Sequence, residues 1–172
     1  MPILRTHRLE LVAADAALAR ASLGDRERFA EALEAKVPRS WPPELFADGE
    51  RDFAERLAGD PELSGWLSWY IVRVERRRTL VGVCGLGGPP NDAGEVTLGY
   101  AILPEFQNKG IATEAVGALI DWAFEDPRTR AILAQTYERL PESIRVLTKN
   151  GLTLAGRGPE PGLLTFALRR PG

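Results

Sequence analysis

Hydrophobic positions recur along the chain with two different spacings. Residues 95–102 are rich in β-branched and aromatic side chains and follow a turn-forming stretch at residues 89–94, which is typical of a strand. In residues 111–124 the apolar side chains return every three or four positions and leave a polar stripe, which predicts a helix. The middle of the chain is therefore expected to be a strand, a short loop and a helix.

Similar patterns predict the elements on both sides of this segment. Strands are expected at residues 6–12, 67–74, 79–86, 129–136, 152–156 and 163–168, and helices at residues 15–22, 25–36, 49–58 and 141–149. The strands at 67–74 and 79–86 are separated by a short charged turn, which favours an antiparallel hairpin. This order predicts an α/β fold with a mixed, mostly antiparallel central sheet flanked by helices. A length of 172 residues suits one domain, residues 1–172.

Composition removes several classes of function. A net charge of -2 argues against a nucleic-acid-binding surface. The chain lacks a signal peptide and any apolar run near the roughly 20 residues of a membrane span, so we expect a cytoplasmic protein without a membrane partner. His7 and Cys84 are the single histidine and cysteine, so no metal constellation is expected, and Cys84 lies in an apolar run that favours a buried structural role. A monomer and a homodimer both remain open.

The loop at residues 104–112 is expected to bind an anion. Pro104 ends strand pairing because proline has no N–H to donate. Gly110 permits unusual backbone angles and a close ligand approach, and the free N–H groups of the next helical turn point outward. A pyrophosphate fits this arrangement, although spacing alone is equally compatible with an ordinary strand-to-helix turn.

The segment Gln107-x-x-Gly110-x-Ala112 resembles the acetyl-CoA loop of the GNAT superfamily of N-acetyltransferases. The tract from Gly99-Tyr100 to Thr113-Glu-Ala115, and the opening Thr6-x-Arg-Leu-x-Leu11, are similar to the branch containing the ribosomal-protein N-terminal alanine and serine acetyltransferases. The resemblance implies transfer of an acetyl group from acetyl-CoA to a primary amine by direct attack in a ternary complex. The acceptor would be a protein N-terminal α-amine or a small-molecule amine.

The same resemblance implies how acetyl-CoA, the acyl-donor co-substrate, would be held without a metal. Pantetheine would lie along the backbone of residues 101–103, and the N–H groups of residues 107–112 would hold the pyrophosphate. A lysine in the loop could add charge, and a threonine could donate its hydroxyl. The expected cofactor-binding residues are Ala101, Ile102, Leu103, Gln107, Asn108, Lys109, Gly110, Ile111, Ala112 and Thr113.

Four residues are candidates for the chemistry and for the acceptor. Glu95 could act as general base, directly or through a water, or could be a solvent-exposed residue of the preceding turn. Ser143 is the nearest substitute for a general acid because Leu147 stands where many relatives have a tyrosine, and its alternative role is a local helix hydrogen bond. The resemblance also suggests Trp41 and Phe46 as lining for the acceptor side, against the alternative of core packing.

Departures from the family pattern keep a second function open. Leu140 stands where the family has a helix-capping Asn, and Leu152 where it has an aromatic residue. Leu147, at the position where many relatives have a tyrosine, gives weight to the alternative of a non-catalytic sensor module that binds acyl-CoA without turnover.

Overall fold

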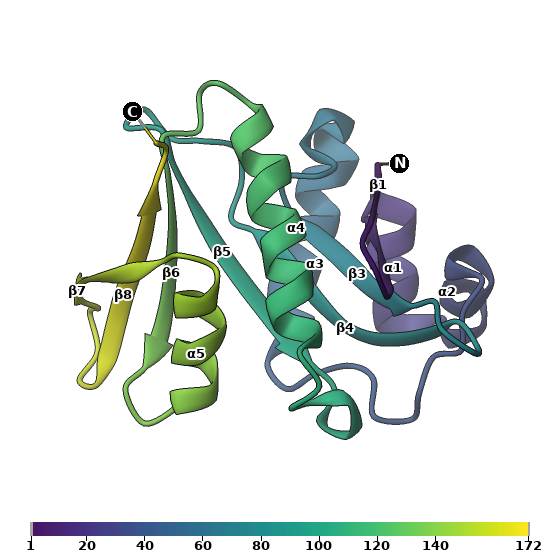
Figure 1. Cartoon of the computed structure of the whole chain (residues 1–172). Coiled ribbons are helices and arrows are strands. Elements are labelled where there is room, and N and C mark those ends of the chain that lie inside the picture. Colours follow the sequence, from purple (N-terminus) through teal and green to yellow (C-terminus); the bar gives the residue numbers. More distant parts are fainter. Residues whose placement is uncertain (1, 172) are drawn as a thin grey trace.

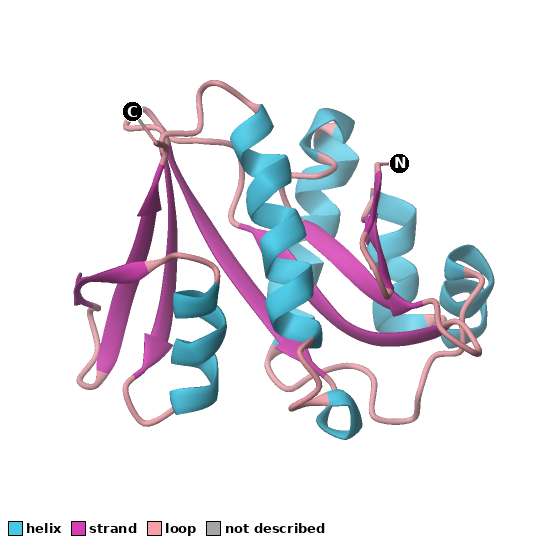
Figure 2. Cartoon of the chain, in the orientation of Figure 1, coloured by secondary structure: helices cyan, strands magenta, loops and turns pink. Residues whose placement is uncertain are grey.

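The computed structural model describes residues 2–171. One eight-stranded sheet runs through the molecule in the order β1-β2-β3-β4-β5-β6-β8-β7, with helices on both faces (Figures 1 and 2). The strands are β1 (Ile3–Arg5), β2 (Leu9–Ala13), β3 (Ser68–Arg73), β4 (Thr79–Leu86), β5 (Glu95–Ile102), β6 (Ala131–Tyr137), β7 (Thr153–Arg157) and β8 (Leu163–Arg169). The helices are α1 (Ala16–Gly24), α2 (Arg26–Leu33), α3 (Phe46–Gly59), α4 (Ile111–Glu125) and α5 (Pro141–Lys149), with short 3-10 turns η1 (Pro61–Leu63) and η2 (Pro104–Phe106).

The expected fold class is confirmed. In residues 2–171 the paired strands are antiparallel except for β5 and β6, which run parallel. The hairpin of β3 and β4 and the central strand and helix, β5 and α4, form where the hydrophobic patterns predict them.

Several predicted boundaries were wrong, each for a local reason. Residues 6–12 form a turn and β2, and β2 pairs with the additional strand β1. The helix expected from residue 49 begins at Phe46, because Leu45 takes the left-handed conformation (φ 62°) and starts the helix without a side-chain cap. Asp48 therefore lies inside the helix, where it pairs with Arg51 at 2.8 Å. The second helix ends at Leu33 because Glu34 is left-handed (φ 50°).

Each face of the sheet has its own hydrophobic core. One core lies under α4 and α5 and includes Val96 and Leu98 of β5. The other lies between the opposite face and α1, α2 and α3, and includes Tyr70 and Val83. Because successive side chains of a strand point to opposite faces, Thr97, Gly99 and Ala101 face the α3 side.

β5 and β6 part halfway along their length. Their pairing runs from Glu95 opposite Ala131 to Leu98 opposite Ala134 and ends there. β6 continues against β8, and β5 continues against β4 as far as Ile102. The backbone edge of β5 from residue 99 to residue 102 therefore faces an opening between the two strands, visible below their contact in Figure 1.

Candidate functional site

The loop that enters α4 presents a run of free backbone donors at the open end of β5. Within residues 2–171, the N–H groups from Asn108 to Thr113 have no hydrogen-bond partner, and Glu114 is the first residue of α4 to find one, Gly110 O at 3.1 Å. Gly110 caps the helix in the left-handed conformation (φ 78°), and Asn108 is also left-handed (φ 62°). Such alternating conformations turn successive N–H groups toward one point, where an anion binds.

Two of the expected cofactor-binding residues, Leu103 and Gln107, use their backbone N–H groups within the protein. Gln107 uses its backbone N–H on Pro104 O (3.3 Å), and its side-chain Nε2 donates to Ile102 O (3.0 Å). Leu103 is buried and donates its N–H to Val81 O at 2.9 Å. Gln107 thus holds the loop against the end of β5, and Leu103 anchors the strand rather than offering a free N–H.

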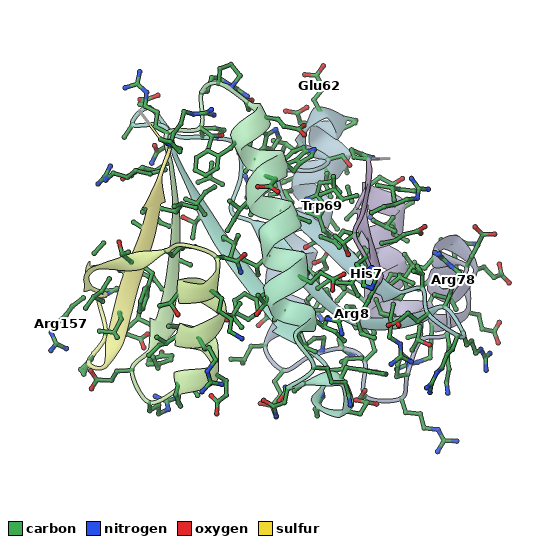
Figure 3. All side chains as sticks on the ribbon, in the orientation of Figure 1. His7, Arg8, Glu62, Trp69, Arg78 and Arg157 are labelled. Atoms are coloured by element: carbon green, nitrogen blue, oxygen red, sulfur yellow. The ribbon has the colours of Figure 1, made fainter. Side chains whose placement is uncertain are left out.

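The turn between β1 and β2 contacts the loop and the first turn of α4. Arg8 donates from Nε to Glu114 Oε1 (2.8 Å) and from Nη1 to Lys109 O (2.9 Å), and Thr6 Oγ1 also donates to Glu114. Figure 3 shows Arg8 beside the N-terminal end of α4. The guanidinium therefore fixes the loop carbonyl on one side while the N–H groups remain free on the other.

A tyrosine and a serine meet across the opening between β5 and α5. Tyr100 OH lies 2.8 Å from Ser143 Oγ and donates to Ser143 O at 3.3 Å. Burial raises the pKa of the Tyr100 phenol, and its hydrogen bond with Ser143 lowers it by less. The phenol therefore keeps its proton at neutral pH and can orient the serine hydroxyl. Tyr100 lay within the quoted motif but was not singled out from the sequence.

On the other side of β5 a pocket of about 380 Å³ opens between the sheet and α3. Its floor is formed by β4 and β5 and includes Gly85, Gly99 and Ala101, and its wall includes Phe46, Glu50 and Phe53 of α3. Tyr100 also borders this pocket. The pocket thus lies on the α3 face of β5, and the donor-rich loop follows the end of the same strand.

The pocket wall carries a buried carboxylate that sequence analysis missed. Glu50 is 2% exposed and accepts hydrogen bonds from Ser68 Oγ (2.6 Å) and Tyr70 OH (2.8 Å). Burial raises the pKa of Glu50, and these two hydroxyl donors act in the opposite direction. A signal was present in the sequence: Glu50 occupies the stripe of α3 that also carries Ala54 and Leu57, where an acidic residue is unusual.

The predicted catalytic and acceptor residues do not border one cavity. Phe46 lines the pocket, whereas Trp41 is 3% exposed, donates from Nε1 to Ser22 O (3.0 Å) and packs against Phe29 in the core. Glu95 lies at the start of β5, where Asn91 Nδ2 donates to its carboxylate at 3.3 Å. Four residues of strand, about 13 Å, separate Glu95 from Gly99. Ser143 does not line the pocket itself, but its hydroxyl forms a hydrogen bond with Tyr100, which does.

Several other expectations are also addressed by the structure. Cys84 is buried, and burial raises the pKa of its thiol far above the ordinary value. In residues 2–171 no group of His, Cys, Asp and Glu side chains is arranged to hold a metal ion. Among the helices described, none has the length and apolar character needed to cross a bilayer.

Comparisons with known proteins identify the family. A family model described as an acetyltransferase (GNAT) domain matches residues 8–153. The uncharacterized N-acetyltransferase YjdG of Bacillus subtilis is 28% identical over 160 residues, which cover 93% of this chain and 95% of the relative. An acetyltransferase from Agrobacterium tumefaciens has the same fold (25% identity, TM-score 0.67, 99% of this chain and 95% of that chain). So does RimL, a ribosomal L7/L12 α-N-protein acetyltransferase in complex with coenzyme A (18% identity, TM-score 0.67, 98% of each chain).

The family match includes β5, the donor-rich loop and α4, the segments on which the resemblance was based. It also includes Arg8 and Glu114, which hold that loop, and Ser143. Because this match spans most of the sequence and the fold agrees with it, the chain belongs to the GNAT family of acetyltransferases.

Proposed function

We propose that the protein transfers an acetyl group from acetyl-CoA to a primary amine by direct attack in a ternary complex. The observation that carries the proposal is the run of free N–H groups from Asn108 to Thr113 beside the unpaired edge of β5. The diphosphate of acetyl-CoA would accept hydrogen bonds from these N–H groups. The amide groups of its pantetheine would bond to the unpaired edge of β5. When bound, acetyl-CoA also supplies the acetyl group as an activated thioester.

The residues present fit this co-substrate. The free N–H groups from Asn108 to Thr113 lie at a helix N-terminus, where a diphosphate is stabilised by hydrogen bonds and by the helix dipole. Lys109 is exposed in the same loop and adds a positive charge, and Thr113 adds a hydroxyl. Thr97 and Leu103 bond to the β4 side, so alternation along the strand directs the backbone groups of Tyr100 and Ile102 toward the opening beside β6, where pantetheine would lie.

Proton transfers fall to side chains on the two faces of β5. The amine nitrogen forms a bond to the acetyl carbon while the carbon–sulfur bond breaks, so one proton leaves the nitrogen and one is needed at the departing sulfur. Tyr100 OH and Ser143 Oγ share a hydrogen bond in which either oxygen can donate, and when the phenol donates, the serine O–H is free to protonate the sulfur. Glu95, on the α3 face of β5, would take the amine proton through intervening water.

The acceptor is a primary amine of a protein N-terminus or of a small molecule. An α-amine with a pKa of about 8 is largely ready to react near pH 7, whereas a lysine-like amine must lose over 3 pKa units, or about 4 to 5 kcal/mol. A remote base acting through water is sufficient to deprotonate an α-amine. The same base is less effective for a lysine-like amine, because more free energy is needed to remove its proton. RimL, whose fold is shared, acts on the α-amine of ribosomal L7/L12.

Calorimetry with acetyl-CoA tests the co-substrate site. Gly110→Asp places a side chain and a negative charge at the cap, where a Cβ would lie 3.3 Å from Arg8 Nη2, and should weaken binding more than tenfold. Gly162→Asp is the matched control, because Gly162 has the same φ of 78° in the loop between β7 and β8. The proposal is wrong if the wild-type protein does not bind acetyl-CoA, or if both variants bind it equally well.

A turnover assay separates the enzyme from a non-catalytic sensor. The sensor alternative is favoured by Leu147, which is 1% exposed and offers no proton at the family's tyrosine position. Release of free CoA thiol with a panel of N-terminal peptides and small amines is expected if Ser143 replaces that tyrosine. Tight acetyl-CoA binding without thiol release from any amine would establish the sensor instead.

A further inference from the structure

Glu50 is a buried carboxyl group for which the proposed chemistry has no use. It projects from the apolar stripe of α3 and is 2% exposed, yet it borders the pocket beside β5. Burying an ionised carboxylate costs several kcal/mol unless another charge compensates it. If the side chain at this position only had to pack against the sheet, an apolar residue would do so at a lower free-energy cost of burial.

The protein supplies Glu50 with hydrogen bonds but with no positive charge. Ser68 Oγ donates to one carboxylate oxygen and Tyr70 OH to the other, so each oxygen keeps a free acceptor site. Within residues 2–171 no Lys, Arg or His side chain forms an ion pair with it. The charged residues that line the pocket, Glu44 and Glu50, are both acidic. The pocket is therefore complementary to a cation.

The pocket floor sets the distance between this charge and β5. Ser68 is paired with Gly85, and Gly85 with Gly99, so three small residues lie in one row across β3, β4 and β5. Two strand spacings, about 10 Å, separate Ser68 from Gly99. The carboxylate held by Ser68 thus lies at the far end of the pocket from the strand where the acetyl group is expected.

We propose that Glu50 binds a second positive charge of the acceptor, and that the acceptor is a short diamine whose other amine receives the acetyl group. The inference rests on the proposed function, because it takes β5 as the place of acetyl transfer. A chain of about four or five carbons, with a hydrogen bond at each end, spans the distance of about 10 Å between the two positions. The otherwise apolar wall, with Phe46 and Phe53, suits the methylene groups between the amines.

Binding of three probes of similar length tests this inference. Putrescine, n-butylamine and the amino alcohol of the same length would be titrated calorimetrically into the full-length protein saturated with CoA, so that no turnover occurs. Putrescine should bind about tenfold or more tightly than either probe that lacks the second amine. Glu50→Gln should remove that advantage and leave n-butylamine binding unchanged. Glu55→Gln removes the same charge from an exposed position of α3 and should bind all three probes as the wild type does.

Each outcome bears on a different claim. Failure of the wild type to bind CoA contradicts the proposed function itself. Normal CoA binding with equal affinity for the three probes, or a putrescine advantage that survives in Glu50→Gln, overturns the role of Glu50 alone. An N-terminal peptide that binds more tightly than putrescine and is indifferent to Glu50→Gln also overturns it.

A second variant covers the case in which Glu50→Gln does not fold. Glu50→Asp keeps the charge but withdraws it by one methylene, so the preference should move from putrescine toward cadaverine, the diamine with one more carbon. An unchanged order of these two diamines in Glu50→Asp would contradict direct recognition by this carboxylate.

Discussion

Arg8 and Glu114, which lie 106 positions apart in the chain, are joined by two hydrogen bonds that connect the turn between β1 and β2 to the first turn of α4. Arg8 donates its backbone N–H to Oε2 (2.9 Å) and its Nε to Oε1 (2.8 Å). The same guanidinium holds Lys109 O, in the middle of the candidate phosphate loop. The opening motif of the chain thus positions the loop from a distance.

Arg8→Met should weaken acetyl-CoA binding without preventing folding. The variant keeps an unbranched apolar side chain but loses the hydrogen bonds to Glu114 and Lys109, so the loop is no longer fixed in its receptive conformation. Hydrogen bonds to charged groups contribute about 1.5 to 3 kcal/mol each, and we expect roughly a tenfold rise in Kd together with a lower free energy of unfolding. Arg5→Met, at an exposed arginine of β1, is the control, and an equal effect of both changes on Kd would contradict this role.

Glu114 should make the free energy of unfolding depend on pH in the acid range. Burial raises its pKa, but hydrogen bonds from Thr6 and from the backbone and side chain of Arg8 outweigh burial and bring the pKa below its ordinary value. A carboxylate with a lowered folded pKa stabilises the fold above its unfolded pKa of about 4.3, and this contribution is lost as pH falls through the folded pKa. Urea unfolding at pH 7 and near pH 3 should show a smaller loss for Glu114→Gln than for the wild type. An identical loss in both proteins would rule out this linkage.

The hydrophobic patterns predicted the helices and strands well, but they predicted the contacts between these elements less well. β5 and α4 formed as expected because each carries its own periodicity, and α5 occupies the range 141–149 expected for it. The predicted N-terminal strand was wrong in its extent, because the pairing of β1 with β2 depends on a turn with no strong local signal.

The roles of some residues could not be predicted from the sequence, because their hydrogen-bond partners lie far away in the chain. Arg78, in the short charged turn between β3 and β4, binds Glu10 at 2.9 Å and the carbonyl groups of Leu33 and Glu34 at the end of α2. Tyr100 could not be linked to Ser143 before α5 was placed beside the opening. Glu50, in contrast, was visible as an acidic residue in an apolar stripe.

Ser143→Ala should lower kcat more than it changes the KM for acetyl-CoA. Loss of a general acid typically costs about 10²-fold or more in rate, whereas the N–H groups that hold the co-substrate are untouched. Tyr100→Phe keeps the ring but removes the hydroxyl that orients Ser143, so we expect a smaller loss in kcat. Thr148→Ala, at an exposed hydroxyl of the same helix, should match the wild type in steady-state kinetics. A loss in Tyr100→Phe that persists when Ser143 is already alanine would show that Tyr100 does not act through the serine.

Leu140→Asn should stabilise α5. Leu140 is the N-cap residue and makes no side-chain hydrogen bond to the first turn, while its own side chain is 39% exposed. An asparagine can accept an N–H of that turn, which is worth about 1 kcal/mol. Chemical denaturation should show this increase in the free energy of unfolding, with little change in the denaturant dependence. A decrease would indicate that the Leu140 side chain contributes packing that outweighs the missing cap.

Gly85 and Gly99 face each other in the row that forms the pocket floor, yet they should respond differently to an added side chain. A Cβ at Gly85 would lie 2.7 Å from Leu67 O, a backbone atom that cannot move aside, so Gly85→Ala should lower the free energy of unfolding by about 1 to 3 kcal/mol. A Cβ at Gly99 would meet no atom within 4 Å, so Gly99→Ala should change stability by no more than about 0.5 kcal/mol.

The space at Gly99 is the pocket itself, and Gly99→Val should fill it and raise the KM for the amine while the protein stays folded. Urea denaturation and amine saturation curves of the three variants check these expectations. Normal amine saturation in a folded Gly99→Val protein would show that the acceptor binds elsewhere.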